Sequence, residues 1–134
     1  MQNELLNTMT YKLLQEKGSA YSAVFEACTS ERSLFSLDID DISELEGYAA
    51  ENGHEIRIMG EFDTDPMAVR NLVNTMLKGA DDRNCLLLAK GCADLQTCTD
   101  IMKNGLPDDL KGSVSFGIMA EDDKKTISLV LVVY

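Results

Sequence analysis

The spacing of hydrophobic residues in the first quarter of the chain predicts helices. Leu6, Met9 and Leu13 recur at helical spacing, which indicates a helix over about residues 2–17. A second apolar stretch, residues 21–28, favours another helix after a break. Its alternation of apolar and polar positions is poor for a strand, but a strand there stays open as an alternative.

An acidic turn opens the middle of the chain. Asp38 or Asp40 can cap a helix that runs to about Glu51, where the sequence Asn-Gly follows as a stop signal. Ile56 and Ile58 then alternate with charged neighbours, which predicts a strand over about residues 54–62. This part of the chain therefore contributes one helix and one strand.

The helix expected next has the clearest periodicity in the chain. Asp65-Pro66 is a typical helix entry, with Asp as the cap and Pro in the first turn. The apolar positions that follow share one helical face: Val69, Leu72, Val73, Met76 and Leu77. The continuous apolar run at residues 85–89 then suits a strand covered on both faces.

The last third of the chain predicts one more helix and two strands. Asp94 is expected to cap a helix that extends to about Lys103. Strands follow over residues 113–120 and 126–133, and the polar segment 121–125 between them predicts a hairpin.

The final strand carries apolar residues on both faces. Ile127, Leu129 and Leu131 lie on one face, while Val130 and Val132 lie on the other. The N-terminal helix is the expected cover for the second face. A β-prone, nearly uncharged strand at a sheet edge would pair with another copy, so it lies inside the sheet or forms a homo-oligomer.

The order of elements predicts a single α+β domain over residues 1–134. A helical segment, residues 1–35, precedes a core, residues 36–134, with the order helix, strand, helix, strand, helix, strand, strand. The four strands are expected to form one mixed sheet.

Charge and composition narrow the possible partners. The net charge of −11 opposes binding to nucleic acid and to anionic membranes, and no basic run offsets it. The first residues lack the pattern of a secretory signal, so a cytoplasmic protein with reduced thiols is expected. The spacing of the four cysteines and one histidine predicts no metal site.

The segment Ser36-Leu37-Asp38-Ile39-Asp40-Asp41 is the most informative place for function. Capping and the helix dipole alone favour carboxylates at a helix start, which is a purely structural explanation. The other acid pairs along the chain lie at predicted turns, where Asp bonds to backbone amides.

From Ser36 onward the chain resembles the C-terminal domain of the tubulin/FtsZ family of cytoskeletal GTPases. That domain starts with an Asn-x-Asp-x-x-Asp loop, matched here by Ser36, Asp38 and Asp41, with Ser in place of the leading Asn. Gly91-Cys92-Ala93-Asp94-Leu95 falls where the family has a Gly-Gly-x-Asp-Leu turn. Residues 115–118 and 127–130 fall on its closing hairpin.

The resemblance implies a non-enzymatic interaction domain. The chain has no Gly-rich phosphate loop of the kind that precedes this domain in the family, so it is not expected to bind GTP alone or to need another cofactor. In the family, the two acids act on the nucleotide held by the next subunit. Here Ser36, Asp38 and Asp41 are expected to contact a filament-forming GTPase of the cell-division type, and so to modulate or cap its assembly.

The same order of elements also occurs in small oligomeric enzymes that resemble the Bacillus-type chorismate mutase or the imine deaminases. Such proteins place sites between subunits and use Arg to hold anionic substrates. Arg57 is the arginine expected to project from a strand, and it is the candidate ligand residue under this alternative. RNA binding on a similar small fold is opposed by the acidity of the chain.

Overall fold

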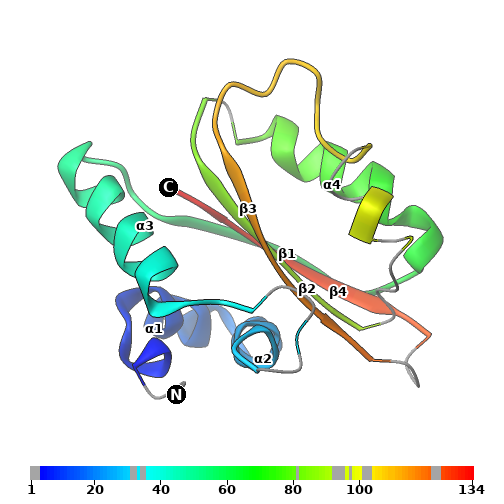
Figure 1. The fold of residues 1–134 in the computed structure, drawn as a ribbon, viewed down its shortest axis with the longest axis horizontal. Helices are drawn as coiled ribbons and strands as arrows, with labels where there is room; N and C mark the ends of the chain where they lie inside the picture. The colour runs from blue at the N-terminus through cyan, green and yellow to red at the C-terminus, as the bar shows by residue number, and fades with distance from the viewer. Residues whose placement is uncertain are drawn as a thin grey trace.

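The computed structural model (Figure 1) describes residues 4–30, 33, 36–80, 82–91, 96, 98–100, 104–121 and 125–134. Its helices are α1 (Met9–Lys17), α2 (Ser19–Cys28), α3 (Ile39–Glu51) and α4 (Val69–Lys78), with short 3-10 turns η1 (Leu5–Asn7) and η2 (Pro66–Ala68). Its strands are β1 (Arg57–Thr64), β2 (Cys85–Gly91), β3 (Val114–Ala120) and β4 (Ile127–Val133).

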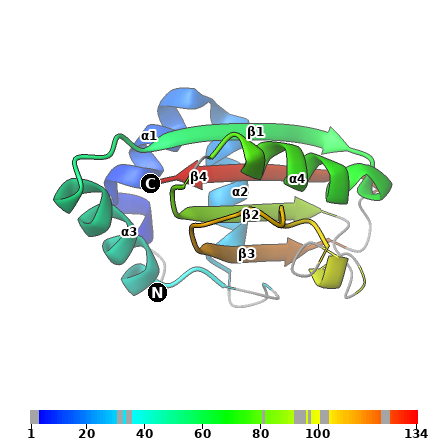
Figure 2. The same cartoon turned by 90° about the horizontal axis from the view of Figure 1, so that it is seen from above.

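The four strands form one mixed sheet in the order β1-β4-β2-β3. Strand β4 is antiparallel to both of its neighbours, whereas β2 and β3 are parallel. Figure 2 shows the strands side by side in this order. The predicted α+β class with a four-stranded mixed sheet is therefore confirmed.

The predicted closing hairpin is wrong, because β2 lies between β3 and β4. Strand β4 is buried on both faces along nearly its whole length, so the centre of the sheet suits it better than a hairpin at the edge. Glu121, which follows β3, and Thr126, which precedes β4, both lie against Gly91 at the end of β2. A Cβ there would collide with the backbone of Thr126, and the φ of +130° also favours glycine.

Helices cover both faces of the sheet (Figure 1). On one face α4 packs on residues of β2, β3 and β4. The buried members of this core are Val69, Val73, Met76, Leu77, Ala80, Cys85, Leu87, Ala89, Cys98, Ile118, Ile127, Leu129, Leu131 and Val133. On the other face α1, α2 and α3 cover Leu86, Leu88, Val130 and Val132. The expected role of the N-terminal segment as a cover is confirmed.

Residues 21–28 are helical, which decides between the two alternatives for that stretch. The helix starts at Ser19, and Tyr21 packs so closely on Gly60 of β1 that a Cβ at Gly60 would lie 2.7 Å from the tyrosine ring. Phe62 meets the same ring edge-on, with centroids 4.8 Å apart. This aromatic contact packs α2 against β1, the outer strand.

The first helix is shorter than predicted, since Thr8 interrupts it and caps α1 by accepting a bond from the Tyr11 amide. A second cap comes from α3. The amide and the hydroxyl of Thr10 both donate to Glu46 Oε2, at 2.7 and 2.6 Å. The Glu46 carboxylate thus joins α3 to α1 at the positive end of the α1 dipole. Thr10 is fully buried, so its two donors depend on this acceptor.

Other boundaries shift by a few residues. Strand β1 begins at Arg57 and ends at Thr64, where the register with β4 shifts and Asp63 adopts a φ of +54°. The helix expected after Asp94 is described only at Gln96 and at residues 98–100, and its predicted cap lies outside the described residues. In the described part of the chain, none of the helices is long and apolar enough to span a membrane.

The bond from Thr10 to Glu46 gives a first prediction. Replacing Glu46 with Ala leaves two buried donors without an acceptor, and we expect the free energy of unfolding to fall by about 1–3 kcal/mol. Urea unfolding measures this loss. Glu44→Ala on the exposed face of α3 is the matched control and should change stability by less than about 0.5 kcal/mol. Equal losses in the two variants would contradict the proposed cap.

Candidate functional site

The three residues predicted to bind a partner lie together at the start of α3. Ser36 donates its hydroxyl to the carbonyl of Ser30 at 2.9 Å, and Asp38 caps the helix by accepting the Asp40 amide at 3.0 Å. Both side chains therefore have local structural roles. Asp41 is exposed, and its carboxylate accepts no hydrogen bond from the described residues. It is the member of the set that is free to contact a partner.

Asp41 belongs to a larger exposed surface on α3. Asp41, Glu44 and Tyr48 are three and four residues apart, so they lie along one face of the helix. Tyr48 is 40% exposed, and its ring meets that of Tyr134 edge-on with centroids 5.9 Å apart. We call Asp41, Glu44, Tyr48 and Tyr134 the α3 face.

The acidic groups of the α3 face lack a cationic partner among the residues that the structure describes. No described Lys or Arg forms an ion pair with Asp41 or Glu44. The pKa of the Tyr134 hydroxyl is raised, first by burial and then by the electrostatic effect of its neighbours Cys85, Glu44, Asp41 and Tyr48. The charges of Asp41 and Glu44 are thus felt at Tyr134. Figure 2 shows α3 at the end of the sheet where β1 begins and β4 ends. The arrangement suits contact with a cation that also packs on an aromatic ring.

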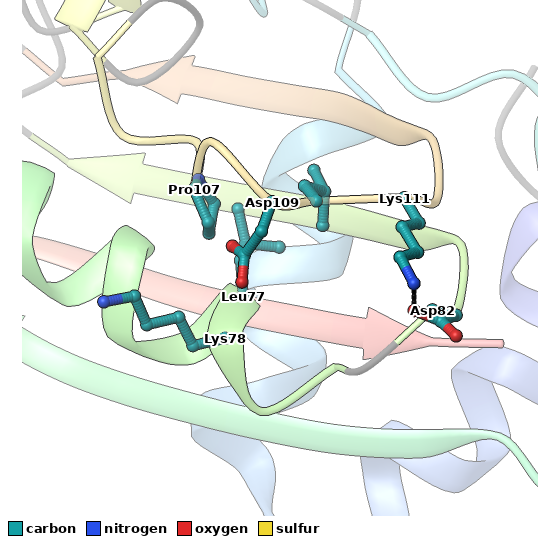
Figure 3. A pocket seen from close by; sticks show the side chains of 7 residues that line it. Leu77, Lys78, Asp82, Pro107, Asp109 and Lys111 are labelled. Carbon is teal, nitrogen blue, oxygen red and sulfur yellow. Dashed lines mark ion pairs between the residues drawn. The ribbon is translucent and has the colours of Figure 1, made fainter.

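The α4 side of the molecule carries a long groove between α4 and the loop at residues 104–111. One hollow of about 650 Å³ is lined by Leu77, Lys78, Pro107 and Asp109 among others, and Figure 3 shows Lys111 directed at Asp82. That ion pair measures 4.0 Å and is largely exposed, so it adds little stability. A second hollow of about 410 Å³ continues past Lys78.

Acids and cations both line the α4 groove. Arg70 and Lys78 contribute positive charge, while Asp108 and Asp109 contribute negative charge in the same hollow. The balance favours neither an anion nor a cation as ligand.

Arg57, the candidate under the alternative function, lines a separate hollow of about 400 Å³ at the start of β1. Lys17, from the end of α1, lies in the same lining, together with Glu55 and Met59. Two cations from different elements thus line one hollow beside the outer strand, and a carboxylate or phosphate is the ligand class that they suit.

The cysteines that the structure describes do not have the environment of nucleophiles. Cys28, Cys85 and Cys98 are buried thiols that form no disulfide with one another. Burial raises the pKa of the Cys28 thiol from 9.0 to about 12, and burial raises that of Cys85 to about 11. Cys92 lies outside the described residues. Among those described, no three His, Cys, Asp or Glu side chains are placed to hold a metal ion.

Two features of the site could not be read from local sequence patterns. The Tyr48–Tyr134 contact joins residues from a helix and from the end of the sheet, and no spacing rule connects them. That Lys17 and Arg57 line the same hollow likewise depends on tertiary structure, because they come from elements far apart in the sequence. The signal for Asp38 was local, because a capping pattern is contained in a few consecutive residues.

Comparison of the chain with protein-family models, with curated proteins and with solved structures finds no match.

The buried thiols give a second prediction. At neutral pH, iodoacetamide should modify Cys28 and Cys85 far more slowly in the folded protein than after unfolding in urea, as peptide mapping by mass spectrometry would measure. The folded pKa of Cys28, about 12, lies above the unfolded value of 9.0. The contribution of the protonated Cys28 thiol to the free energy of unfolding is therefore complete below pH 9.0, and it is lost as the pH rises toward 12. Equal labelling rates in the folded and unfolded protein would contradict the prediction.

Proposed function

We propose that this chain is a non-enzymatic protein-interaction domain that docks through the α3 face on a basic surface of a partner. The observation that carries the proposal is the pair of exposed carboxylates of Asp41 and Glu44, which form no ion pair with the described residues, beside the exposed ring of Tyr48. A Lys or Arg of the partner can pair with a carboxylate and lie on the ring at the same time.

The sharper form of the proposal draws on the resemblance to the C-terminal domain of the tubulin/FtsZ family. Ser36, Asp38 and Asp41 match the acidic loop of that domain, and Asp38 caps the helix that begins at Ile39. The absence of a closing hairpin removes one motif from the resemblance, so support now comes from the acidic loop and the order of elements. The partner under this proposal is a filament-forming GTPase of the family, and the chain caps or modulates its polymer.

The geometry of the acidic loop supports Asp41 and Glu44 as the residues of the proposed contact. Asp38 is engaged in capping, and Ser36 is bonded to Ser30, so they hold the loop in shape. Asp41 and Glu44 project into solvent and carry the charge that a partner would meet. Removing them should weaken binding without unfolding α3.

Co-sedimentation with a filament-forming GTPase of this family tests the proposal. The double variant D41N/E44Q should bind the polymer about tenfold more weakly than the natural chain, a loss of ~1.4 kcal/mol. The control D108N/D109N removes the same charge on the opposite side of the sheet and should bind normally. If an excess of the natural chain leaves the polymer mass and the GTP turnover unchanged, the proposal is wrong.

A second candidate function is favoured by the hollow at Arg57. We infer from Lys17 and Arg57 in one lining that a small anion could bind there, as in oligomeric enzymes or ligand-binding proteins that resemble the Bacillus-type chorismate mutase or the imine deaminases. In those proteins the sites lie between subunits, so this candidate requires an oligomer.

The anion site gives a further prediction. Titration with a dicarboxylate should shift the amide resonances of residues 55–59 in the natural chain, and Arg57→Gln should abolish the shift because the site loses a bidentate donor. Lys125→Gln, an exposed position elsewhere, is the control and should leave the shift unchanged. Identical titration curves for all three proteins, or a shift confined to other residues, would exclude the site.

A further inference from the structure

Strand β3 lies at an edge of the sheet, because β2 pairs with one side of it and none of the described strands pairs with the other. We propose that this edge pairs with β3 of a second copy of the chain, antiparallel and across a two-fold axis, to form one continuous sheet through a dimer. The inference is independent of the function proposed for the α3 face.

The backbone groups available at this edge can be identified from the hydrogen bonds to β2. Ser113 accepts the Cys85 amide at 2.8 Å, and the Glu121 amide donates to Gly91 at 2.6 Å. In a parallel pair, alternate residues direct both backbone groups at the neighbouring strand. The odd-numbered residues of β3 therefore face β2, and the even-numbered residues face outward.

The outward-facing residues are Val114, Phe116, Ile118 and Ala120. Within the described chain, no residue outside β3 donates to or accepts from their backbone groups. Unpaired amides and carbonyls in a row are a template for another strand.

The two edges of the sheet differ in how well they are protected. The outer strand β1 carries the charges of Arg57, Glu61 and Asp63, and its register shifts between Glu61 and Thr64. Charged side chains and bulges are the usual means by which an edge avoids another strand. Strand β3, in contrast, has the sequence Val-Ser-Phe-Gly-Ile-Met-Ala, and its pairing with β2 is unbroken from Val114 to Ala120.

The sequence of β3 is also complementary to itself. With Gly117 opposite Gly117 of the second copy, Phe116 stands opposite Ile118 of that copy and Val114 stands opposite its Ala120. Phe116, Ile118, Val114 and Ala120 all face outward, so each Phe116–Ile118 pair and each Val114–Ala120 pair exchanges two hydrogen bonds. An aromatic residue opposite a β-branched one is a favourable cross-strand pair, and no like charges face each other along the seam.

With this two-fold axis, the face of the sheet that packs on α4 lies on the same side in both copies. Val114, Phe116 and Ile118 lie on the α4 side in both copies, since all three pack on the core beneath α4. The apolar seam would continue that core from one copy into the next. The net charge of −11 on each copy opposes association, so salt that screens the repulsion should strengthen the dimer.

Solution mass at increasing protein concentration tests the proposal. Light scattering after gel filtration should show the mass rise from 14.8 kDa toward twice that value, at lower concentration when salt is added. Ser115→Glu puts a charge on the exposed edge and should raise the dimer dissociation constant by at least about tenfold. Thr75→Glu makes the same charge change on the exposed side of α4 and should dimerise like the natural chain.

A second variant and a residue-level measurement guard against loss of folding. Val114→Pro removes an outward-facing amide and spares the bonds to β2, so the variant should fold as a monomer. By hydrogen exchange, the amides of Phe116 and Ile118 should become protected as concentration rises, while those of Ser115 and Gly117 are protected throughout. A monomer at every concentration and salt level, or a dimer unaffected by Ser115→Glu and Val114→Pro, would overturn the proposal.

Discussion

Burial of β4 on both of its faces is the constraint on which the rest of the structure depends. Leu129 and Leu131 enter the core beneath α4, and Val130 and Val132 enter the core beneath the N-terminal helices. Such a strand is stable only where it is paired on both sides and covered above and below. Its position between β1 and β2 satisfies this requirement, and it accounts for the order of the sheet and for the two layers of helices.

The layer of N-terminal helices in turn determines which side chains α3 exposes to solvent. Ile42 and Leu45 bury one side of α3 in the core that α1, α2 and the sheet share, and Glu46 joins α3 to α1 through Thr10. With these contacts fixed, Asp41 and Glu44 are left on the solvent side. The acidic surface is therefore a consequence of how α3 packs.

Local patterns in the sequence predicted the elements better than their arrangement. The helical spacing after Asp65-Pro66 and the cap at Asp38 depend on neighbouring residues, and both agree with the structure. The hairpin was wrong because a polar turn between two β-prone segments does not show whether a third strand lies between them. The two-sided apolar pattern of β4 did contain that signal, since a strand with no polar face belongs inside a sheet.

The placement of β4 is tested most directly by nuclear Overhauser contacts between backbone protons of neighbouring strands. The structure predicts that Leu131 is close to both Met59 of β1 and Leu87 of β2. It predicts no contacts between the backbones of β3 and β4. Contacts from Leu131 to Met59 and to Leu87 would support the account, and a ladder of contacts between β3 and β4 would contradict it.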